Sequence, residues 1–287
     1  MDLAYLRAHP QQLPTFLKHQ RVRETPVSGG SICTASRLTF DTGESVFTKS
    51  FANPPDGFFA AEAHGLRWLR KAGAVPVPEV IAELPDLLAL EWIEPGAPSA
   101  RAAERFGREL AALHRSGAPG FGAEWPGFIG SLPMDNTVST GPWADWFVTR
   151  RLEPYLRMSD CFSGSDRASL SRALDRVGDL AGPAEPPARL HGDLWPGNLL
   201  WGADDTAWLV DPAAHGGHRE TDLALLGLWG GVRHLDRILA AYREEYPLAE
   251  GWRERVPLHQ LYLLLVHTAL FGGAYRESVM SATMRFV

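Results

Sequence analysis

The chain has few cysteines, no long apolar run and no excess of basic residues. Only Cys33 and Cys161 are cysteines among 287 residues, and they lie far apart in the sequence. They form neither a CxxC pair nor a disulfide framework, which favours a reducing cytoplasm over a secreted location. The net charge of −6 argues against a nucleic-acid-binding protein, because such proteins usually carry a basic face.

Targeting and membrane segments are not evident either. The first residues, MDLAYLRAHPQQ, have no basic flank followed by an apolar core, so no signal peptide is expected. The most apolar run, 261–273, is shorter than a membrane span and contains His267, which predicts a buried helix. We therefore expect a cytoplasmic protein with no membrane partner. A monomer is the default expectation, although the sequence leaves the oligomeric state open.

What is present is the composition of an ordinary globular protein, with 45% apolar and 22% charged residues. Residue alternation predicts two strands within 31–50 and another over 87–93, and helical spacing predicts a helix over 58–71. The Pro- and Gly-containing segment 95–98 is read as a linker, with Ser99 as the N-cap of the next helix. Further helices are predicted over 143–156, 166–180 and from 222 onward.

These elements predict an α+β fold of two lobes. The smaller lobe, residues 1–95, would hold an antiparallel sheet plus one helix and bind a nucleotide. The larger lobe, residues 96–287, would be mainly helical and carry the catalytic and substrate-binding residues. The chain is long enough for both lobes to bury a core.

The densest signal is LHGDLWPGNLLWGADDTAWLVDPA, residues 190–213. Asp193 and Asn198 stand five apart in a loop, and two short apolar runs around the turn 202–206 predict a hairpin directly after it. Asp211 follows the second run. This order predicts that the three side chains meet at one end of the hairpin.

Phosphoryl transfer needs such a set of side chains. One carboxylate orients the attacking hydroxyl and accepts its proton, while an amide oxygen and a second carboxylate hold Mg²⁺ against the nucleotide phosphates. The spacing matches the protein-kinase pattern H-R-D-x-x-x-x-N, followed by a hairpin and a metal-binding Asp. The alternative is a polar loop with Asp and Asn as turn formers, which explains the agreement of loop, spacing and hairpin less well.

A kinase fold also requires a lysine on a strand and a glutamate on the following helix. Lys49 ends the second predicted strand, and Glu62 lies within an apolar stripe of the predicted helix. A carboxylate in such a stripe is costly unless it is paired. We therefore predict an ion pair between them that presents the ammonium to the α- and β-phosphates of ATP. The alternative for Lys49 alone is an exposed residue at the end of a strand.

Two further segments complete the predicted nucleotide site. One strand upstream of Lys49 lies SGGS, whose small residues would let backbone N–H groups approach the phosphates, although a simple turn has the same sequence. The residues predicted to cradle the phosphates are Gly29, Gly30 and Ser31. The run 90–94, at the end of the third predicted strand, would form the hinge whose backbone meets adenine, although an ordinary buried strand predicts the same residues. Its central residues are Glu91, Trp92 and Ile93.

The stretches HGDLWPGN and DPAAHGGHRETDLALL resemble the fructosamine kinase (ketosamine 3-kinase) family, which is related to the aminoglycoside and choline phosphotransferases. The segments FFAAEAHGLRWL, FGAEWPGFIGSLPMDN and WADWFVTRRLEPYL extend the resemblance over nearly the whole chain. It implies phosphorylation of the sugar 3-hydroxyl of a ketosamine, a glycated amine, with ATP and Mg²⁺. The product is unstable and releases the amine, so the family repairs glycation.

By this resemblance, Asp193 would be the catalytic base, Asn198 and Asp211 the metal ligands, and Lys49 with Glu62 the phosphate-binding pair.

The resemblance also implies further roles around the substrate. Trp195 would form a flat wall against the sugar-amine. The residues matching the family pattern on the predicted substrate side are His218, Arg219 and Glu220. Asp222 would brace the loop by accepting backbone N–H bonds, while His191 and His114 are expected to be structural. Met134 departs from the pattern, since a glutamine is expected near the substrate there.

Two alternatives stay open. The acceptor could be another hydroxyl compound such as an aminoglycoside, for which an acidic cleft would be suitable. The chain could also be a pseudokinase that binds nucleotide as a scaffold. The presence of every residue of the predicted catalytic set argues against that second alternative.

Overall fold

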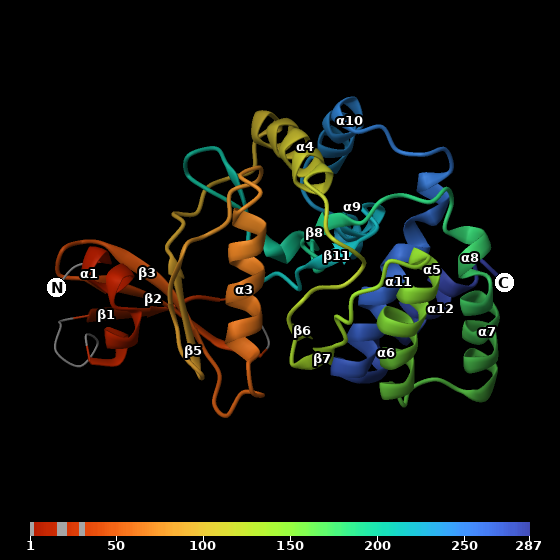
Figure 1. Ribbon diagram of the computed structural model, residues 1–287, viewed down its shortest axis with the longest axis horizontal. Helices are drawn as coiled ribbons and strands as arrows, with labels where there is room; N and C mark the ends of the chain where they lie inside the picture. Colours follow the sequence, from red (N-terminus) through yellow and green to blue (C-terminus); the bar gives the residue numbers. More distant parts are fainter. Residues whose placement is uncertain (1–2, 16–21, 29–31) are drawn as a thin grey trace.

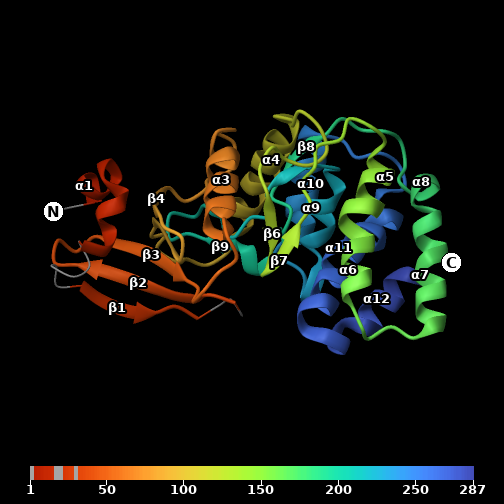
Figure 2. The ribbon, with the colours of Figure 1, turned by 60° about the horizontal axis from the view of Figure 1, so that its bottom comes forward.

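An antiparallel sheet of five strands forms the N-terminal part of the protein (Figure 1). This computed structural model describes residues 3–15, 22–28 and 32–287. The strands lie in the order β1–β2–β3–β5–β4, and every neighbouring pair is antiparallel; Figure 2 shows β1, β2 and β3 side by side. Their bounds are β1 (Val22–Pro26), β2 (Thr34–Phe40), β3 (Ser45–Ser50), β4 (Val80–Glu83) and β5 (Leu87–Glu91).

The two faces of the sheet pack on different partners, because successive side chains of a strand point to opposite faces. On β5, Leu88 and Leu90 join the core that contains α3 (Phe58–Arg70), whereas Ala89 joins a core with α1 (Leu3–Ala8). Helix α3 therefore lies between the sheet and the rest of the molecule (Figure 1). A 3₁₀ turn, η1 (Pro10–Gln12), follows α1.

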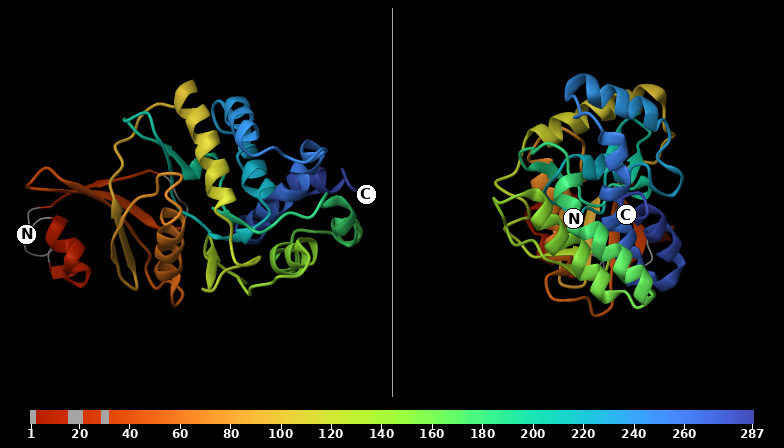
Figure 3. Two further views of the ribbon diagram at one scale, coloured as in Figure 1. Left: turned by 45° about the horizontal axis from the view of Figure 1, so that its top comes forward. Right: turned by 90° about the vertical axis from the view of Figure 1, so that its right-hand side faces the viewer.

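Helices dominate the C-terminal part. Helices α4 and α10 pack side by side (Figure 3), and α11 is buried along most of its length. The helical segments are α4 (Ala100–Arg115), α5 (Trp143–Phe147), the π-helical η2 (Val148–Leu152), α6 (Glu153–Met158), α7 (Gly164–Asp175), α8 (Val177–Leu180), α9 (Glu220–Leu225), η4 (Leu228–Gly230), α10 (Leu235–Glu245), α11 (Trp252–Phe271), η5 (Gly272–Tyr275) and α12 (Arg276–Thr283). Within the described ranges, no helix is both long and apolar enough to cross a membrane.

Three pairs of short strands complete this part. They are β6 (Gly127–Ile129) with β7 (Leu132–Met134), β8 (Ala188–Leu190) with β11 (His215–Gly217), and β9 (Leu199–Trp201) with β10 (Ala207–Leu209). A short 3₁₀ turn, η3 (Pro196–Asn198), precedes β9.

The predicted two-lobed α+β fold is confirmed, with additions. The three predicted strands are β2, β3 and β5, the predicted hairpin is β9–β10, and residues 261–271 of the apolar run fall in the largely buried α11. Ser99 caps α4 by accepting the backbone N–H of Ala102 at 3.0 Å. Strands β1 and β4 and helix α1 were not predicted, so the first lobe holds more than three strands and one helix.

A segment of the C-terminal part holds α3 in place. Phe128 of β6 packs on Phe58 with ring centroids 5.4 Å apart, and Trp125 stacks on His64 at 4.3 Å. At Gly65 the backbone of α3 comes so close to the chain after β10 that a Cβ added at this position would lie 3.1 Å from the Ala214 side chain. One core therefore spans both sides of the predicted boundary at residues 95–96.

Candidate active site

The loop 191–198, here called the Asp193 loop, is anchored at both ends by strands. It begins where β8 ends, and β8 pairs with β11. It ends in η3, which leads directly into the hairpin β9–β10. The segment 211–214 returns from this hairpin to β11. Asp211 is therefore brought back beside the loop although it lies 18 residues from Asp193.

Asp222 supports the start of the Asp193 loop through hydrogen bonds to its backbone, as predicted. Its carboxylate accepts the backbone N–H of His191 at 2.7 Å and of Gly192 at 2.9 Å. Nε2 of His114 lies 3.3 Å from the same carboxylate, and Nδ1 of His114 lies 2.9 Å from the hydroxyl of Tyr242. The predicted structural role of His114 is confirmed by these contacts, since the ring is buried with both nitrogens paired.

His191 is also structural, as predicted. Its Nε2–H donates to the carbonyl of Val210 at 2.8 Å, and its Nδ1 accepts the backbone N–H of Asp193 at 3.2 Å. Burial lowers the pKa of His191, which favours this neutral form. Gly192 has φ 80°, a left-handed conformation that glycine adopts without steric cost. The backbone that carries Asp193 is thus held by several hydrogen bonds.

Asp193 and Asn198 are in contact. The side-chain amide of Asn198 donates to the backbone carbonyl of Asp193 at 2.8 Å and to its Oδ2 at 2.9 Å. Burial raises the pKa of the Asp193 carboxyl well above its usual value, and the nearby carboxylates of Asp211 and Asp222 act in the same direction.

Lys49 joins the small lobe to the Asp193 loop. Its ammonium is 2.8 Å from both carboxylate oxygens of Glu62 and 2.9 Å from Oδ1 of Asp211. The predicted Lys49–Glu62 contact is therefore present. Burial alone would lower the pKa of Lys49, but the carboxylates of Asp211 and Glu62 together raise it, so the ammonium stays charged. Asp211 itself has φ 54°, a strained conformation for a residue with a side chain.

The oxygen atoms of this group fit a hard divalent cation. Oδ1 of Asp193 is buried, and the described residues offer it no hydrogen-bond partner. Asp211 adds a second carboxylate. Asn198 adds its amide oxygen, while the NH₂ group of the same amide donates to Asp193. Carboxylate and amide oxygens are the ligands that Mg²⁺ and Ca²⁺ prefer.

These side chains open into one cleft of about 500 Å³ between the two lobes. Residues of both lobes line it, with Ala35 and Phe47 on one side and Met134 on the other. The predicted site residues that line it are Lys49, Glu62, Asp193, Trp195, Asn198 and Asp211. The ring of Trp195 folds over Gly197, where a Cβ would overlap it, and so lies flat along the Asp193 loop.

Comparison with known proteins identifies the family. The family model described as fructosamine kinase matches residues 8–287. The chain belongs to the fructosamine kinase family. It is 37% identical to a protein named "Probable ketoamine kinase" from Thermus thermophilus, over 90% of this chain and 91% of that one. It is 33% identical to the chloroplastic protein-ribulosamine 3-kinase of Arabidopsis thaliana, over 89% of this chain and 79% of that one.

Solved structures agree on the fold. A crystal structure described as a fructosamine-3-kinase from Thermobifida fusca superposes with a TM-score of 0.87 at 45% identity, covering 93% of this chain and 94% of that one. The amicoumacin kinase hAmiN, solved with AMP-PNP and Ca²⁺, superposes with a TM-score of 0.60 at 12% identity, covering 99% and 94%. This distant match shows the kinase-like fold alone.

The structure does not test two predicted parts of the nucleotide site in this member of the fructosamine kinase family. Gly29, Gly30 and Ser31 lie outside the described residues. Of the predicted hinge residues, Glu91 ends β5 and Trp92 and Ile93 follow it, and none of the three is among the cleft-lining residues. The chain then meets the hairpin through the Gly96 N–H, 2.6 Å from the carbonyl of Trp201. The Glu91 carboxylate accepts the backbone N–H of Glu79 at 3.1 Å, and the Trp92 ring lies under the guanidinium of Arg37 at 4.4 Å.

The predicted substrate residues His218, Arg219 and Glu220 lie elsewhere. All three are buried, and none lines the cleft. Arg219 forms a two-point ion pair with Glu185, at 2.6 and 2.7 Å. Because their polar groups are used inside the fold, this placement argues against direct contact with substrate.

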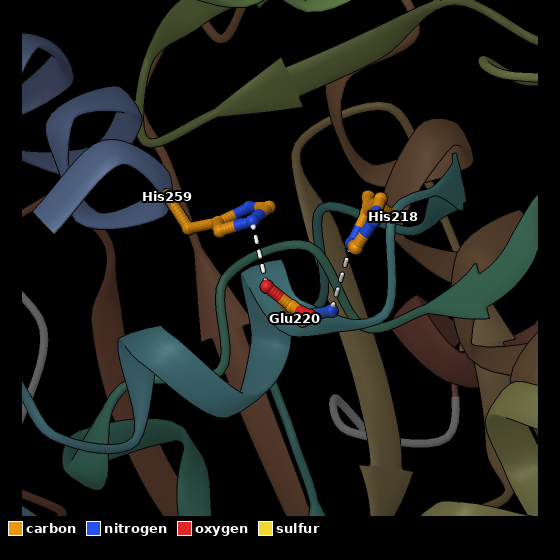
Figure 4. Close-up of side chains that lie close together, drawn as sticks. All are labelled: His218, Glu220 and His259. Atoms are coloured by element: carbon orange, nitrogen blue, oxygen red, sulfur yellow. Dashed lines mark hydrogen bonds and ion pairs between the residues drawn. The ribbon is translucent and has the colours of Figure 1, made fainter. Parts of the chain in front are cut away.

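Figure 4 shows Glu220 between two histidines. Nε2 of His259 is 3.5 Å from the Glu220 carboxylate, and Nδ1 of His218 accepts the Glu220 backbone N–H at 3.3 Å. The ligand atoms of the three residues lie within 4.8 Å of one another, a spacing that could hold a metal ion. However, Arg255 donates to both carboxylate oxygens of Glu220 at 2.7 and 2.8 Å. The carboxylate is therefore already paired with a cation, and we interpret the cluster as structural.

The sequence did not predict the aromatic residues at the other end of the cleft, which are Trp229, His267, Phe271 and Tyr275. The only sequence signal is the glycine pair after Trp229, which marks a turn without indicating a site.

Proposed function

We propose that this chain is an ATP-dependent kinase that phosphorylates the 3-hydroxyl of a ketosamine such as a fructosamine or ribulosamine. The observation that carries the proposal is the single cleft in which Lys49, paired with Glu62, meets Asp193, Asn198 and Asp211. Family membership supports the ketosamine as acceptor, because the relatives are named ketoamine and protein-ribulosamine kinases. Phosphorylation of this hydroxyl would lead to release of the free amine and so to deglycation.

In the proposed reaction, the sugar hydroxyl attacks the γ-phosphorus of ATP. The new P–O bond forms as the bond to ADP breaks, and Asp193 accepts the hydroxyl proton. Lys49 would bind the α- and β-phosphates, with Glu62 fixing its position. Asn198 and Asp211 would hold Mg²⁺, which neutralises phosphate charge when bound. The hAmiN structure, with its AMP-PNP and Ca²⁺, supports a nucleotide and a divalent cation in this fold.

Other residues would position the two substrates. Trp195 would lie against the sugar-amine, since its ring lines the cleft two residues after Asp193. The backbone of residues 91–93 would meet the adenine, because this segment joins the two lobes. We also propose that the glycine pair Gly29–Gly30, with Ser31, covers the phosphates. A cytoplasmic location is consistent with two unpaired cysteines.

The test is ADP release with Mg·ATP and four acceptors: a ribulosamine, a fructosamine, an aminoglycoside and choline. Turnover should occur with a ketosamine, and Asp193→Ala should abolish it while nucleotide affinity is largely kept. Turnover with the aminoglycoside or choline alone would refute the acceptor but keep the mechanism. Nucleotide binding without any turnover would point to the pseudokinase instead. Wild-type turnover by Asp193→Ala would refute the role of that carboxylate.

A further inference from the structure

Trp229 is the centre of an aromatic cluster at the end of the cleft beyond Asp193. Its ring is 5.2 Å from Trp195 in an edge-on contact, 4.4 Å from His267 and 6.1 Å from Tyr275, measured between centroids. These residues come from three segments: the Asp193 loop, the η4 turn, and α11 with η5. Trp229 nevertheless remains 41% exposed, so the contacts hold the ring at the cleft without burying it.

Trp229, whose ring lines the cleft, has a strained backbone conformation. Its φ of 48° and ψ of 46° lie in the left-handed region, and Gly230 and Gly231 follow with φ of 95° and 73°. A residue with a Cβ adopts this conformation at a cost in free energy, and such outliers gather at functional sites. A half-exposed ring contributes less to a core than a buried one, so core packing alone does not account for the strain.

The charges of the cleft suit one cationic group at this end. Among the described lining residues, Lys49 is the single Lys or Arg, and it is paired with Glu62 and Asp211. His267 donates its Nδ1–H to the carbonyl of Leu263 at 2.9 Å, and burial lowers its pKa, so the ring is neutral. The described lining carboxylates, Glu62, Asp193 and Asp211, lie around Lys49 and Asn198, so a second or third ammonium of a polycation would find no carboxylate at the aromatic end.

We propose that Trp229 is a specificity-determining residue whose ring binds the ammonium group of the acceptor through a cation–π contact. The proposal rests on the proposed ketosamine kinase activity and names the feature of the substrate that is read. A ketosamine carries its amine on the carbon two positions from the hydroxyl that would face Asp193, and this amine is protonated near neutral pH. With Trp195 against the sugar, the neighbouring Trp229 ring is within reach of that amine, and aromatic faces bind alkylammonium groups.

The experiment compares two acceptors that differ in one group. The first is an N-alkyl ribulosamine, which is cationic, and the second is the ribulose 1-O-alkyl ether, which is neutral and of the same shape. Wild-type enzyme should favour the amine in kcat/KM. Trp229→Leu should lower kcat/KM for the amine about 5- to 30-fold, change the ether little, and leave KM for ATP within about twofold. Trp229→Phe should retain part of the preference.

A second variant guards against misfolding. Trp229→Asn removes the ring but suits the left-handed backbone, which asparagine tolerates. It should reproduce the selective loss on the amine. Equal losses on both acceptors, or a wild-type enzyme that does not distinguish them, would refute the role of Trp229 and leave the kinase activity standing. Absence of wild-type turnover on every ketosamine would instead refute the proposed function and this inference with it.

Discussion

Lowering the pH from 7 to 5 tests how the buried histidines affect stability. Burial lowers the pKa of His215 and of His218 from 6.5 to about 3. Nδ1–H of His215 donates to the carbonyl of Ala213 at 2.7 Å, in surroundings that exclude water. Both rings are therefore neutral in the folded protein at pH 5, whereas in the unfolded chain they are mostly protonated.

Burial and the groups that face His218 determine how far its pKa is lowered. After burial, the His259 ring 5.1 Å away is the next cause that lowers the pKa of His218; Glu220 opposes it, and the cations of Arg219 and Arg255 reinforce it. A proton that binds to the His218 ring in the folded protein would therefore enter a buried environment that already contains cations. Substitution of His218 by a residue that does not titrate should remove this effect.

The sign and size follow from linkage. As the pH falls through 6.5, the unfolded state takes up protons that the folded state does not, so the free energy of unfolding decreases. Each pKa unit corresponds to about 1.4 kcal/mol. At pH 5, each of the two histidines therefore lowers the free energy of unfolding by about 2 kcal/mol, and the pair lowers it by about 4 kcal/mol. His191 and His259, whose pKa values burial also lowers, act in the same direction. That loss is a large fraction of the roughly 5–15 kcal/mol typical of a folded domain.

Urea unfolding followed by tryptophan fluorescence at pH 7 and pH 5 measures this loss, and the ten tryptophans of the chain provide the signal. The pH 5 limit stays above the ordinary pKa of the carboxyl groups in the unfolded chain. The raised pKa of Asp193 acts against the loss, so the comparison with a His218 variant isolates the histidine contribution. His218→Gln should reduce the loss by about 2 kcal/mol, whereas His9→Gln, at an exposed position, should leave it unchanged. A wild-type loss below about 1 kcal/mol, or an equal loss in His218→Gln, would refute the reasoning.

Three substitutions test other parts of the structure. Gly197→Ala should displace the Trp195 ring and raise KM for the acceptor about tenfold while KM for ATP stays the same; a parallel rise in both would contradict the proposed role of the ring. Asp222→Asn should lower the free energy of unfolding by about 2–4 kcal/mol, because an amide places a donor against the backbone N–H groups that the carboxylate now accepts, and an unchanged urea midpoint would rule this out. Gly65→Val should cost about 1–3 kcal/mol and lower kcat, because its methyl groups would push α3 from Ala214, and a variant with unaltered kcat would show that the close approach is dispensable.

Local signals explain which elements could be predicted. Ser99 before a helical stretch and the two apolar runs around 202–206 are short-range patterns, and both gave the expected structures. Strands β8 and β11 are only three residues long and pair across 24 intervening residues, 191–214, so no local pattern marks them. Strand β1 ends in Pro26, a residue that lowers strand propensity and is tolerated there because β1 lies at the edge of the sheet.

The site divides in the same way. The spacing from Asp193 to Asn198 lies within one loop, and the Lys49–Glu62 contact could be predicted because a carboxylate in an apolar stripe needs a partner. The position of Trp229 beside Trp195 depends on how α11, η4 and the Asp193 loop pack together, which spacing does not report. For Arg219, the resemblance could suggest a role but not show that Glu185 already binds the guanidinium.

The attachment of α3 to the C-terminal part bears on how such an enzyme can be controlled. Phe128 and Trp125 hold the helix from one side and the sheet holds it from the other, so contacts with both parts of the molecule set the position of Glu62 beside Lys49. An inactive arrangement with this helix displaced would cost the packing of Phe128 and Trp125 on it as well as the Lys49–Glu62 ion pair. Control by moving this helix would therefore be energetically costly in this fold.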